Sequence, residues 1–258
     1  MSSTAIPKGA VNETCPWSGK PVSPDSLTLY QGHVVGFCNT GCRDKFEIAV
    51  AHFETAIAGL PRPSTLLMFA GARIGPARLS EAVLVVVDAQ AEYTTGSLPL
   101  DGVEAALETI GRLLERARRI GTPIIHVVQR GRAGGLFDPA GPGWPVDARA
   151  APREGETIVE KTLPNAFAGT DLHARLRELG RPNLILVGFA THMCISSSAR
   201  AGLDLGHAVT VIADATATRA LPGVLGGPTL AGQAVHVAAL AELADRFAAV
   251  VVEDQVED

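Results

Sequence analysis

The sequence predicts an α/β fold, a six-stranded parallel sheet with helices on both faces, preceded by a small cysteine-rich hairpin–helix module. Three observations lead to this prediction. From residue 82 onward, short β-branched apolar runs alternate with helical stretches, the pattern of a parallel sheet covered on both faces. Three of the four cysteines lie before residue 60. Between these regions, residues 59–79 are rich in Pro and Gly, as connectors are.

Six strands are expected in the larger region. They lie at 82–88, 123–129, 156–161, 184–190, 208–214 and 249–253. Each is a short apolar run, typical of a strand buried on both faces. Helices are expected at about 101–121, 170–179, 193–205 and 230–247. Asp101 and Glu104 are a candidate capping pair for the first helix, and Gly121 and Gly180 are candidate stops.

These elements predict how the chain is divided. We expect a small module at 10–58, a linker at 59–79 and a larger domain at 80–254. Four large apolar residues in the linker predict that it packs against another part of the protein. They are Leu66, Leu67, Met68 and Phe69.

Composition narrows the class of function. Hydrophobic residues make up 47% of the 258 residues and charged residues 19%, which is ordinary globular usage. The net charge is -5, and no basic run is present, so we expect a small-molecule substrate and no nucleic-acid partner. The sequence begins without a secretory signal pattern, and its apolar runs are too short to cross a bilayer. We therefore expect a cytoplasmic protein without a membrane partner.

Three reactive side chains follow predicted strands at their carboxyl ends, the edge where open parallel sheets bind ligands. Asp88 closes the first strand, Lys161 closes the third, and Cys194 follows the fourth after one short turn. Taken singly, each has an ordinary structural explanation as a turn cap, a solvated lysine or a packed thiol. Their joint placement instead predicts one site.

The three residue types suit acyl transfer. Cys194 is expected near the first turn of a helix, where the helix dipole and a neighbouring Lys161 would favour the thiolate. Asp88 could take the thiol proton, pass it to a leaving amine and then activate water. Backbone N–H groups at the helix start could stabilise the tetrahedral oxyanion.

Three motifs in this order carry a family resemblance: VVVDAQ with Asp88, VEKTLPNAFAGTDL with Lys161, and VGFATHMCISSSAR with Cys194. Residues 80–252 resemble the isochorismatase-like hydrolase superfamily, which includes nicotinamidases and N-carbamoylsarcosine amidohydrolases. The resemblance implies an Asp–Lys–Cys triad and an oxyanion hole made by the backbone N–H groups of Ala190 and Cys194. It also implies a cis peptide between Phe189 and Ala190, and a homo-oligomer, either a dimer or a tetramer.

Departures from the family pattern narrow the reaction. Nicotinamidases carry histidine metal ligands after the second strand, but QRGRAGGLFDPAGPGW contains no histidine. We therefore expect no catalytic cofactor. The presence of Cys194 favours cleavage of an amide, carbamoyl or related C–N bond over isochorismatase-type ether hydrolysis, which remains an alternative. A non-catalytic metal- or redox-responsive ligand-binding protein is a further alternative, which the intact triad argues against.

The long segment 130–155 is a candidate lid over the substrate pocket. Four residues are tentative pocket residues: Phe137, Trp144, Phe167 and His192. Arg130 or Arg132 could hold a substrate carboxylate. Alternatively, the aromatic residues only pin the loop to the core. His126, inside an apolar strand, is expected to be a core histidine.

The N-terminal cysteines form a separate signal, with Cys15 followed by a Cys38-x3-Cys42 pair. With Tyr30, Gly32 and Phe37, residues 13–54 resemble the small metal-associated YHS or TRASH modules. Three thiolates suit zinc or a soft metal such as Cu(I).

The pattern has one departure, because Ser18 stands where many such modules have another cysteine. A fourth ligand would come from His33, from Asp25, from water or from nothing. Alternatively, the thiols pack as reduced apolar residues, or the module binds a partner.

Overall fold

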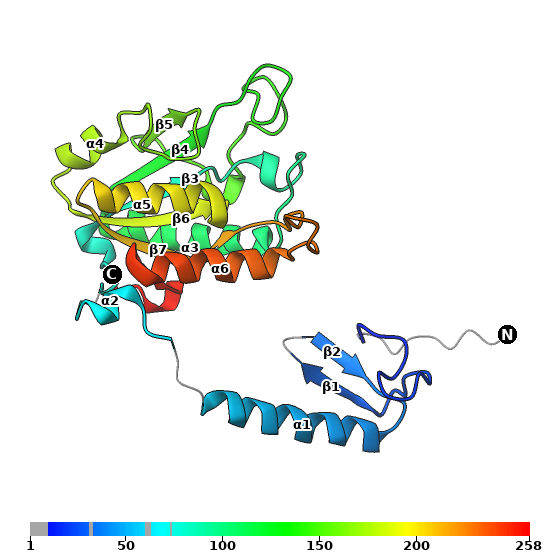
Figure 1. The fold of residues 1–258 in the computed structure, drawn as a ribbon. Helices are drawn as coiled ribbons and strands as arrows, with labels where there is room; N and C mark the ends of the chain where they lie inside the picture. Colours follow the sequence, from blue (N-terminus) through cyan, green and yellow to red (C-terminus); the bar gives the residue numbers. More distant parts are fainter. Residues whose placement is uncertain (1–9, 31–32, 60–62, 73) are drawn as a thin grey trace. The chain divides into compact units, whose positions relative to one another are not determined.

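The computed structural model describes residues 10–30, 33–59, 63–72 and 74–258, and Figure 1 shows the course of the chain. Two compact units are present, Met1–Pro63 and Ser64–Asp258, and each has its own fold. The domain boundaries proposed from the sequence stay predictions. No helix among the described residues is long and apolar enough to cross a membrane.

Within its described residues, the larger unit contains a six-stranded sheet in the order β5-β4-β3-β6-β7-β8, with every neighbouring pair parallel. The strands are β3 (Ala82–Val87), β4 (Ile124–Gln129), β5 (Thr157–Lys161), β6 (Asn183–Phe189), β7 (Ala208–Ala217) and β8 (Ala249–Val251). The predicted fold class and all six predicted strands of this unit are confirmed. The central strand β3 is buried along its whole length, because helices cover both faces of the sheet.

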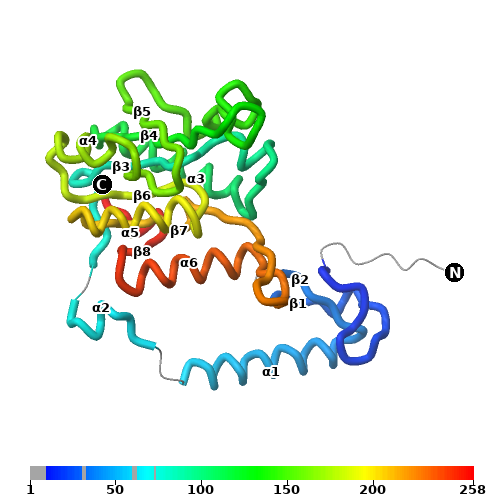
Figure 2. The backbone as a smooth tube through the Cα atoms, turned by 45° about the horizontal axis from the view of Figure 1, so that its top comes forward, coloured from blue at the N-terminus to red at the C-terminus, as the bar shows by residue number. Residues whose placement is uncertain are grey.

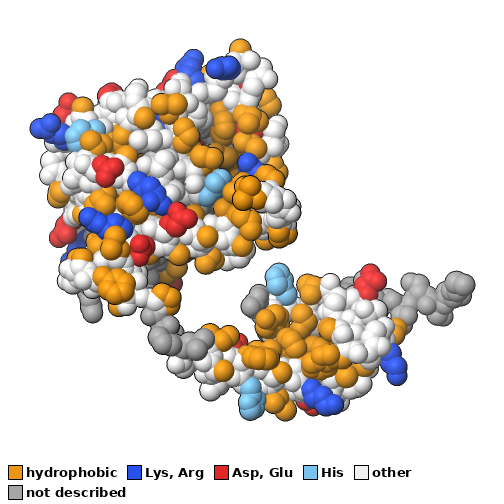
Figure 3. Space-filling model, in the orientation of Figure 1, with side chains coloured by type: hydrophobic (Ala, Val, Ile, Leu, Met, Phe, Trp, Pro, Cys, Tyr) orange, Lys and Arg blue, Asp and Glu red, His pale blue; other side chains and the backbone are white. Residues whose placement is uncertain are grey.

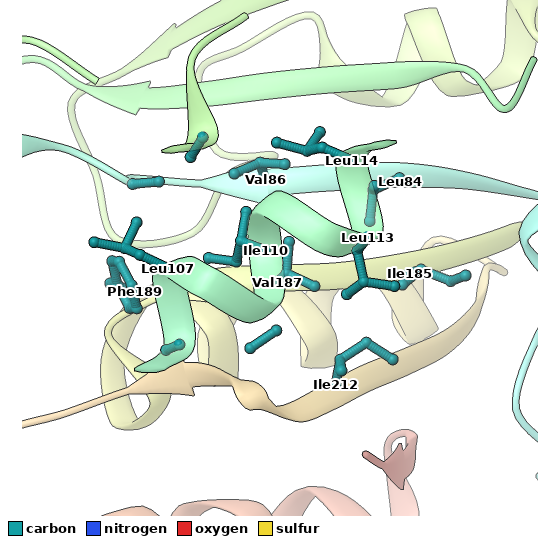
Figure 4. Close-up of a cluster of buried hydrophobic side chains, with 14 of the residues drawn as sticks. Leu84, Val86, Leu107, Ile110, Leu113, Leu114, Ile185, Val187, Phe189 and Ile212 are labelled. Carbon is teal, nitrogen blue, oxygen red and sulfur yellow. The ribbon is translucent and has the colours of Figure 1, made fainter. Parts of the chain in front are cut away.

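One face of the sheet is covered by α3 (Val103–Ile120). Its buried leucines and isoleucines recur at helical spacing and pack on alternate residues of β3 and β6, as Figure 4 shows for Leu107, Ile110 and Leu114. The helix ends at Gly121, whose left-handed backbone (φ 74°) closes the last turn as predicted.

The opposite face is covered by α4 (Leu172–Glu178), α5 (Ser196–Asp204) and α6 (Gly232–Arg246), which share a second core cluster with the other alternate residues of β3 and β6. Figure 2 shows α5 and α6 side by side. The segment between β4 and β5 extends beyond the end of β4 (Figure 1).

One local prediction in this unit is wrong. Asp101 and Glu104 do not cap α3, because its N-cap residue is Gly102 and no side chain caps the helix. Instead, the backbone of Asp101 pairs with Thr218. The linker was expected to pack against another part of the protein, and α2 (Leu66–Phe69) does contact α6, where the Leu66 N–H donates to the Asp245 carboxylate at 2.8 Å. The contact buries little apolar surface, because the side chain of Phe69 is 79% exposed and only Leu67 is half-buried.

The smaller unit is a hairpin followed by one helix. Strands β1 (Leu27–Tyr30) and β2 (His33–Gly36) are antiparallel, and α1 spans Thr40–Ala58. The Asn39 side chain caps α1 by accepting from the Cys42 N–H. Gly32, part of the resemblance noted above, lies outside the described residues.

Aromatic rings form the core of this small unit. Phe37 packs against Trp17 on one side and Phe46 on the other, and Tyr30 meets Phe46 edge to face. The last turns of α1 are exposed, including Phe53 and Ile57, and apolar side chains are prominent on the face of this unit visible in Figure 3. So few buried residues give this unit a much smaller core than the sheet domain.

Candidate active site

The three predicted catalytic residues lie at one edge of the sheet. Asp88 directly follows β3, Lys161 is the last residue of β5, and Cys194 lies in a single π-helical turn, Thr191–Ile195, between β6 and α5. The strands are parallel, so their carboxyl ends meet at this edge. The chain therefore delivers all three from separate elements to one place.

Lys161 links the other two side chains. Its ammonium nitrogen lies 2.7 Å from Oδ2 of Asp88 and 3.5 Å from the sulfur of Cys194. The side chains of Asp88 and Lys161 are fully buried, and Cys194 is 4% exposed. A buried ion pair persists only where each charge is compensated, and here the lysine compensates the carboxylate while touching the thiol.

The surroundings keep the thiol protonated at rest. Burial raises the pKa of Cys194 to about 12, with the Asp88 carboxylate adding to the rise and the Lys161 ammonium opposing it. The expectation of a thiolate favoured by the helix start is therefore wrong, because burial and a neighbouring anion outweigh the dipole. The thiol needs a base, and Asp88 lies beside it.

Asp88 has the character of such a base. Burial raises the pKa of its carboxyl, and the Lys161 charge limits the rise. The Lys161 ammonium, 2.7 Å away, is the main compensation of this carboxylate, and hydrogen bonds from the Lys161 and Cys194 side chains also oppose the rise. Because burial outweighs these contacts, the Asp88 carboxyl accepts a proton more readily than an exposed one.

Two glutamines that the sequence reasoning missed surround Lys161. Gln129, the last residue of β4, accepts from the ammonium through Oε1 at 2.5 Å. Gln90, fully buried, accepts from the backbone N–H of Gln129 at 2.8 Å and donates to the backbone carbonyl of Trp144 at 3.0 Å. No sequence motif predicts these contacts. The signal available in the sequence was only their position at strand ends beside Asp88 and Lys161.

The predicted oxyanion hole lies next to Cys194. The peptide between Phe189 and Ala190 is cis, as the resemblance implied. The Ala190 N–H donates to no backbone carbonyl among the described residues, so it is free to meet an oxyanion. The assignment of the Ala190 and Cys194 N–H groups to this role stays a prediction.

Two histidines hold the turn that carries Cys194. His192 hydrogen-bonds Thr218 through Nδ1, and burial together with the Arg219 charge lowers the pKa of His192. His236 of α6 contacts the hydroxyl of Thr191 at 2.9 Å. The described contacts of His192 support the turn and include none with the triad.

The candidate lid, residues 130–155, approaches the triad through Phe137. This residue is buried, with a positive φ of 56°, and its ring lies 5.1 Å from that of Tyr93. Tyr93 also contacts Phe189, and burial with the charges of Asp88 and Cys194 raises its pKa. The sequence reasoning missed Tyr93, although it follows Asp88 by one short turn and lies close enough for the charges of Asp88 and Cys194 to act on it. Trp144, half-exposed, contributes its backbone carbonyl through Gln90.

Other predicted pocket residues lie elsewhere. Phe167 stacks on His207, directly before the start of β7, at the opposite edge of the sheet from the triad, so its assignment to the pocket is corrected. Arg130 pairs with Glu160, and Arg132 is exposed. His126 is buried in β4 and bonds Glu156 at 2.9 Å, as expected for a core histidine.

The three N-terminal cysteines also come together. The sulfurs of Cys15, Cys38 and Cys42 all lie within 4.8 Å of one another. Burial raises the pKa of Cys15, but hydrogen bonds from the Ser18 hydroxyl and from nearby backbone N–H groups outweigh it and lower the value to about 6. A thiolate-favouring position is what a soft metal requires.

The expected fourth ligands are not part of this cluster. Asp25 accepts hydrogen bonds from Ser23 and Ser26 instead, and His33 is exposed and outside the group. Ser18 lies beside the cluster, with its hydroxyl oxygen 3.1 Å from the sulfur of Cys38, so its single O–H proton serves either this sulfur or that of Cys15. The resemblance of this unit to YHS or TRASH modules stays a prediction.

Comparison with known proteins concerns the larger unit. Residues 82–255 match the family described as the isochorismatase domain. A secreted isochorismatase effector of Verticillium dahliae is 40% identical over 176 residues, which cover 68% of this chain and 90% of the relative. A maleamate amidohydrolase of Pseudomonas putida is 31% identical over 166 residues, 58% of this chain and 77% of the relative.

A solved structure agrees with the sequence relatives. The crystal structure of an isochorismatase from Pseudomonas putida KT2440 is 40% identical and has a TM-score of 0.73. It covers 76% of this chain and 100% of that one.

Proposed function

The chain belongs to the isochorismatase family of hydrolases, and from this premise we propose that it cleaves an amide, carbamoyl or related C–N bond of a small molecule through a Cys194 thioester. It is an enzyme of the cysteine hydrolase class. The observation that carries the proposal is the Lys161 ammonium, which touches both the Asp88 carboxylate and the Cys194 sulfur.

In the first half-reaction Asp88 takes the thiol proton while the sulfur attacks the carbonyl carbon. The new C–S bond pushes electrons onto the carbonyl oxygen, which the N–H groups of Ala190 and Cys194 stabilise. Asp88 then returns the proton to the leaving nitrogen as the C–N bond breaks. The amine departs and a thioester on Cys194 remains.

In the second half-reaction water replaces the amine. Asp88 removes a proton from water as its oxygen attacks the thioester carbon, and the same oxyanion contacts apply. Collapse of this intermediate breaks the C–S bond, and the proton on Asp88 returns to the sulfur. The Lys161 ammonium lies beside the sulfur and stabilises it whenever the sulfur is anionic.

A second candidate reaction is isochorismatase-type ether hydrolysis. The 40% identical relative is named an isochorismatase effector, which favours it. The relative named an amidohydrolase favours C–N cleavage. The two reactions differ in their need for a nucleophile, because ether hydrolysis by acid assistance needs no thioester. Dependence on Cys194 therefore separates them.

The test is ammonia release from a panel of small amides, half-amides of dicarboxylic acids and ureido compounds. We expect turnover of at least one class by the wild type, loss of it in Cys194→Ala, and retention in Cys15→Ala. Turnover of isochorismate that survives Cys194→Ala would establish the ether reaction instead. Absence of turnover with the panel and with isochorismate would favour the non-catalytic ligand-binding alternative.

For the small unit we propose metal binding by Cys15, Cys38 and Cys42, with zinc or a soft metal such as Cu(I) as the ion. The convergence of three sulfurs with a lowered pKa at Cys15 supports this role. We expect purified protein to carry metal that Cys38→Ser loses. Metal content equal in wild type and Cys38→Ser would contradict it.

We also propose that the enzyme works in the cytoplasm as a homo-oligomer, a dimer or tetramer. Support for the compartment comes from the cysteines, because all four are free and unpaired thiols suit a reducing environment. The named secreted relative makes the location worth measuring. Cell fractionation and light scattering on the purified protein test the two points.

A further inference from the structure

We propose that Gln129 is a positioning residue for catalysis, whose side-chain carbonyl holds the Lys161 ammonium against Cys194. This inference rests on the proposed function of Asp88, Lys161 and Cys194. Gln129 does not touch the expected reacting atoms. It acts through the lysine.

The contacts of Lys161 carry the argument. An ammonium group has three N–H donors, and Lys161 contacts three groups: Gln129 Oε1 at 2.5 Å, Asp88 Oδ2 at 2.7 Å and the Cys194 sulfur at 3.5 Å. The two oxygens are close and the sulfur is the most distant. With the Gln129 oxygen present, Asp88 is not the sole strong acceptor for the lysine, so the ammonium is held between its partners.

The sheet places Gln129 where this contact can form. Gln129 is the register partner of Lys161 across the parallel pair β4–β5, so the two side chains leave the sheet on the same face. Its backbone is fixed from the other side, because Gln90 bonds both its N–H, at 2.8 Å, and its carbonyl, at 3.2 Å. Buried Gln90 therefore locks the backbone from which the Gln129 amide reaches the lysine.

A neutral acceptor suits this position. Within the described part of the chain, Asp88 is the one ion-pair partner of Lys161. A carboxylate at residue 129 would orient the ammonium equally well, but it would compete for the lysine charge and disfavour ionised Asp88. The amide orients the lysine without that competition, so Asp88 keeps the support it needs to act as the base.

The first test needs no substrate, so it is independent of the proposed reaction. We would follow the rate of iodoacetamide addition to Cys194 by mass spectrometry at pH 9 in wild type, Gln129→Met and Gln233→Met. Methionine has similar length but no strong acceptor. We expect Gln129→Met to react roughly threefold to tenfold more slowly, because a lysine that leaves the sulfur no longer stabilises the thiolate. Exposed Gln233 is the matched control and should not change the rate.

The sign of this change separates positioning from mere packing. A residue that only fills space would, when replaced, loosen the site and speed alkylation of the buried thiol. A faster or unchanged rate in Gln129→Met, with its melting temperature near that of wild type, would overturn the proposal. If Gln129→Met does not fold, Gln129→Glu, which keeps the acceptor, provides the second measurement.

That second measurement is the pH dependence of kcat/KM. Gln129→Glu should retain KM but move the acid limb to higher pH, since a second carboxylate beside Lys161 disfavours ionised Asp88. Gln129→Met should lower kcat by about tenfold to a hundredfold with KM little changed. An acid limb identical to wild type in Gln129→Glu would show that residue 129 does not contact Lys161, and without that contact the positioning role fails. Failure of the proposed function would appear separately, as wild-type turnover that does not need Cys194.

Discussion

Each of the two units buries a cysteine, and the two thiols behave in opposite ways. Cys15 is 1% exposed and its pKa is lowered to about 6, while Cys194 is 4% exposed and its pKa is raised to about 12. Burial raises both values. The difference comes from what faces the sulfur: hydroxyl and backbone N–H donors at Cys15, and a carboxylate at Cys194.

The comparison shows that burial alone does not set the protonation state of a thiol, which depends on the groups that face the sulfur. Donors around Cys15 favour a resting thiolate, which suits a ligand that binds a cation. The carboxylate beside Cys194 disfavours a resting thiolate but supplies a base, which suits a nucleophile ionised only as it attacks. The same side chain therefore suits two different proposed chemistries in one chain.

The largest expected effect comes from removing the proposed base, Asp88, and a carboxylate of the small unit provides the control. Asp88→Asn should lower kcat/KM by about 10²- to 10⁴-fold, because no other described acceptor lies beside the thiol. Asp25→Asn, in the small unit, where the carboxylate accepts hydrogen bonds from Ser23 and Ser26, is the matched control and should keep full activity. Steady-state kinetics on both variants measure this, and an Asp88→Asn variant that remained active would contradict the role of Asp88 as the base for Cys194.

The ion pair gives the next effect. Lys161→Met should abolish most turnover and also cost about 3–5 kcal/mol of unfolding free energy, since it leaves the Asp88 carboxylate buried without its partner. Adding Asp88→Asn to this variant should recover much of the stability but none of the activity. Urea denaturation of the single and double variants measures this. A double variant no more stable than Lys161→Met would mean that Asp88 is uncharged in the folded protein.

Alkylation sharpens the contrast between the thiols. In metal-free protein, the reaction of Cys15 with iodoacetamide should already be pH-independent above about 7, because its thiol is ionised above about 6. Cys194 should instead react more slowly, at a rate that keeps rising from pH 7 to pH 10, because its pKa is about 12. Mass spectrometry of each cysteine peptide across this pH range tests both. A plateau for Cys194 near neutral pH would show that its resting state is a thiolate.

Metal removal gives the smallest expected effect on activity. Chelation should loosen residues 10–58, because binding of the metal by the three deprotonated thiols is coupled to the folding of this unit. The value of kcat/KM should stay within about twofold of the untreated enzyme, which corresponds to a change of roughly 0.4 kcal/mol in activation free energy. Metal analysis, hydrogen exchange and kinetics on one chelated sample would show this. Activity lost with the metal and regained on adding it back would make the two sites interdependent.

The parallel sheet and the positions of the triad residues could be predicted from the sequence for one physical reason. Asp88, Lys161 and Cys194 each sit at the end of an apolar strand, and parallel strands end at the same edge. The protonation state of Cys194 was not accessible, because it depends on how deeply the thiol is buried and how near the carboxylate lies. The position of Cys194 near a helix start, taken alone, predicted a lowered pKa for the thiol, whereas its pKa is raised.

The supporting residues were missed for a related reason. Gln129 matters through its register with Lys161, and a glutamine at a strand end carries no signature of that pairing. Phe167 was misplaced because it follows Lys161 closely in the chain, while the chain between them crosses to the opposite edge of the sheet, where Phe167 stacks on His207. The capping pair at Asp101 failed because Gly102 adopts a left-handed backbone there.

The central claim is that turnover passes through a thioester on Cys194. The most direct measurement is rapid acid quench of wild-type enzyme with an amide substrate that is turned over, followed by mass spectrometry of the intact chain and of the Cys194 peptide. We predict an adduct equal to the acyl part of the substrate on Cys194, formed in the first turnover and released by hydroxylamine. An adduct on another residue, or full turnover with no adduct and with Cys194→Ala still active, would contradict the account.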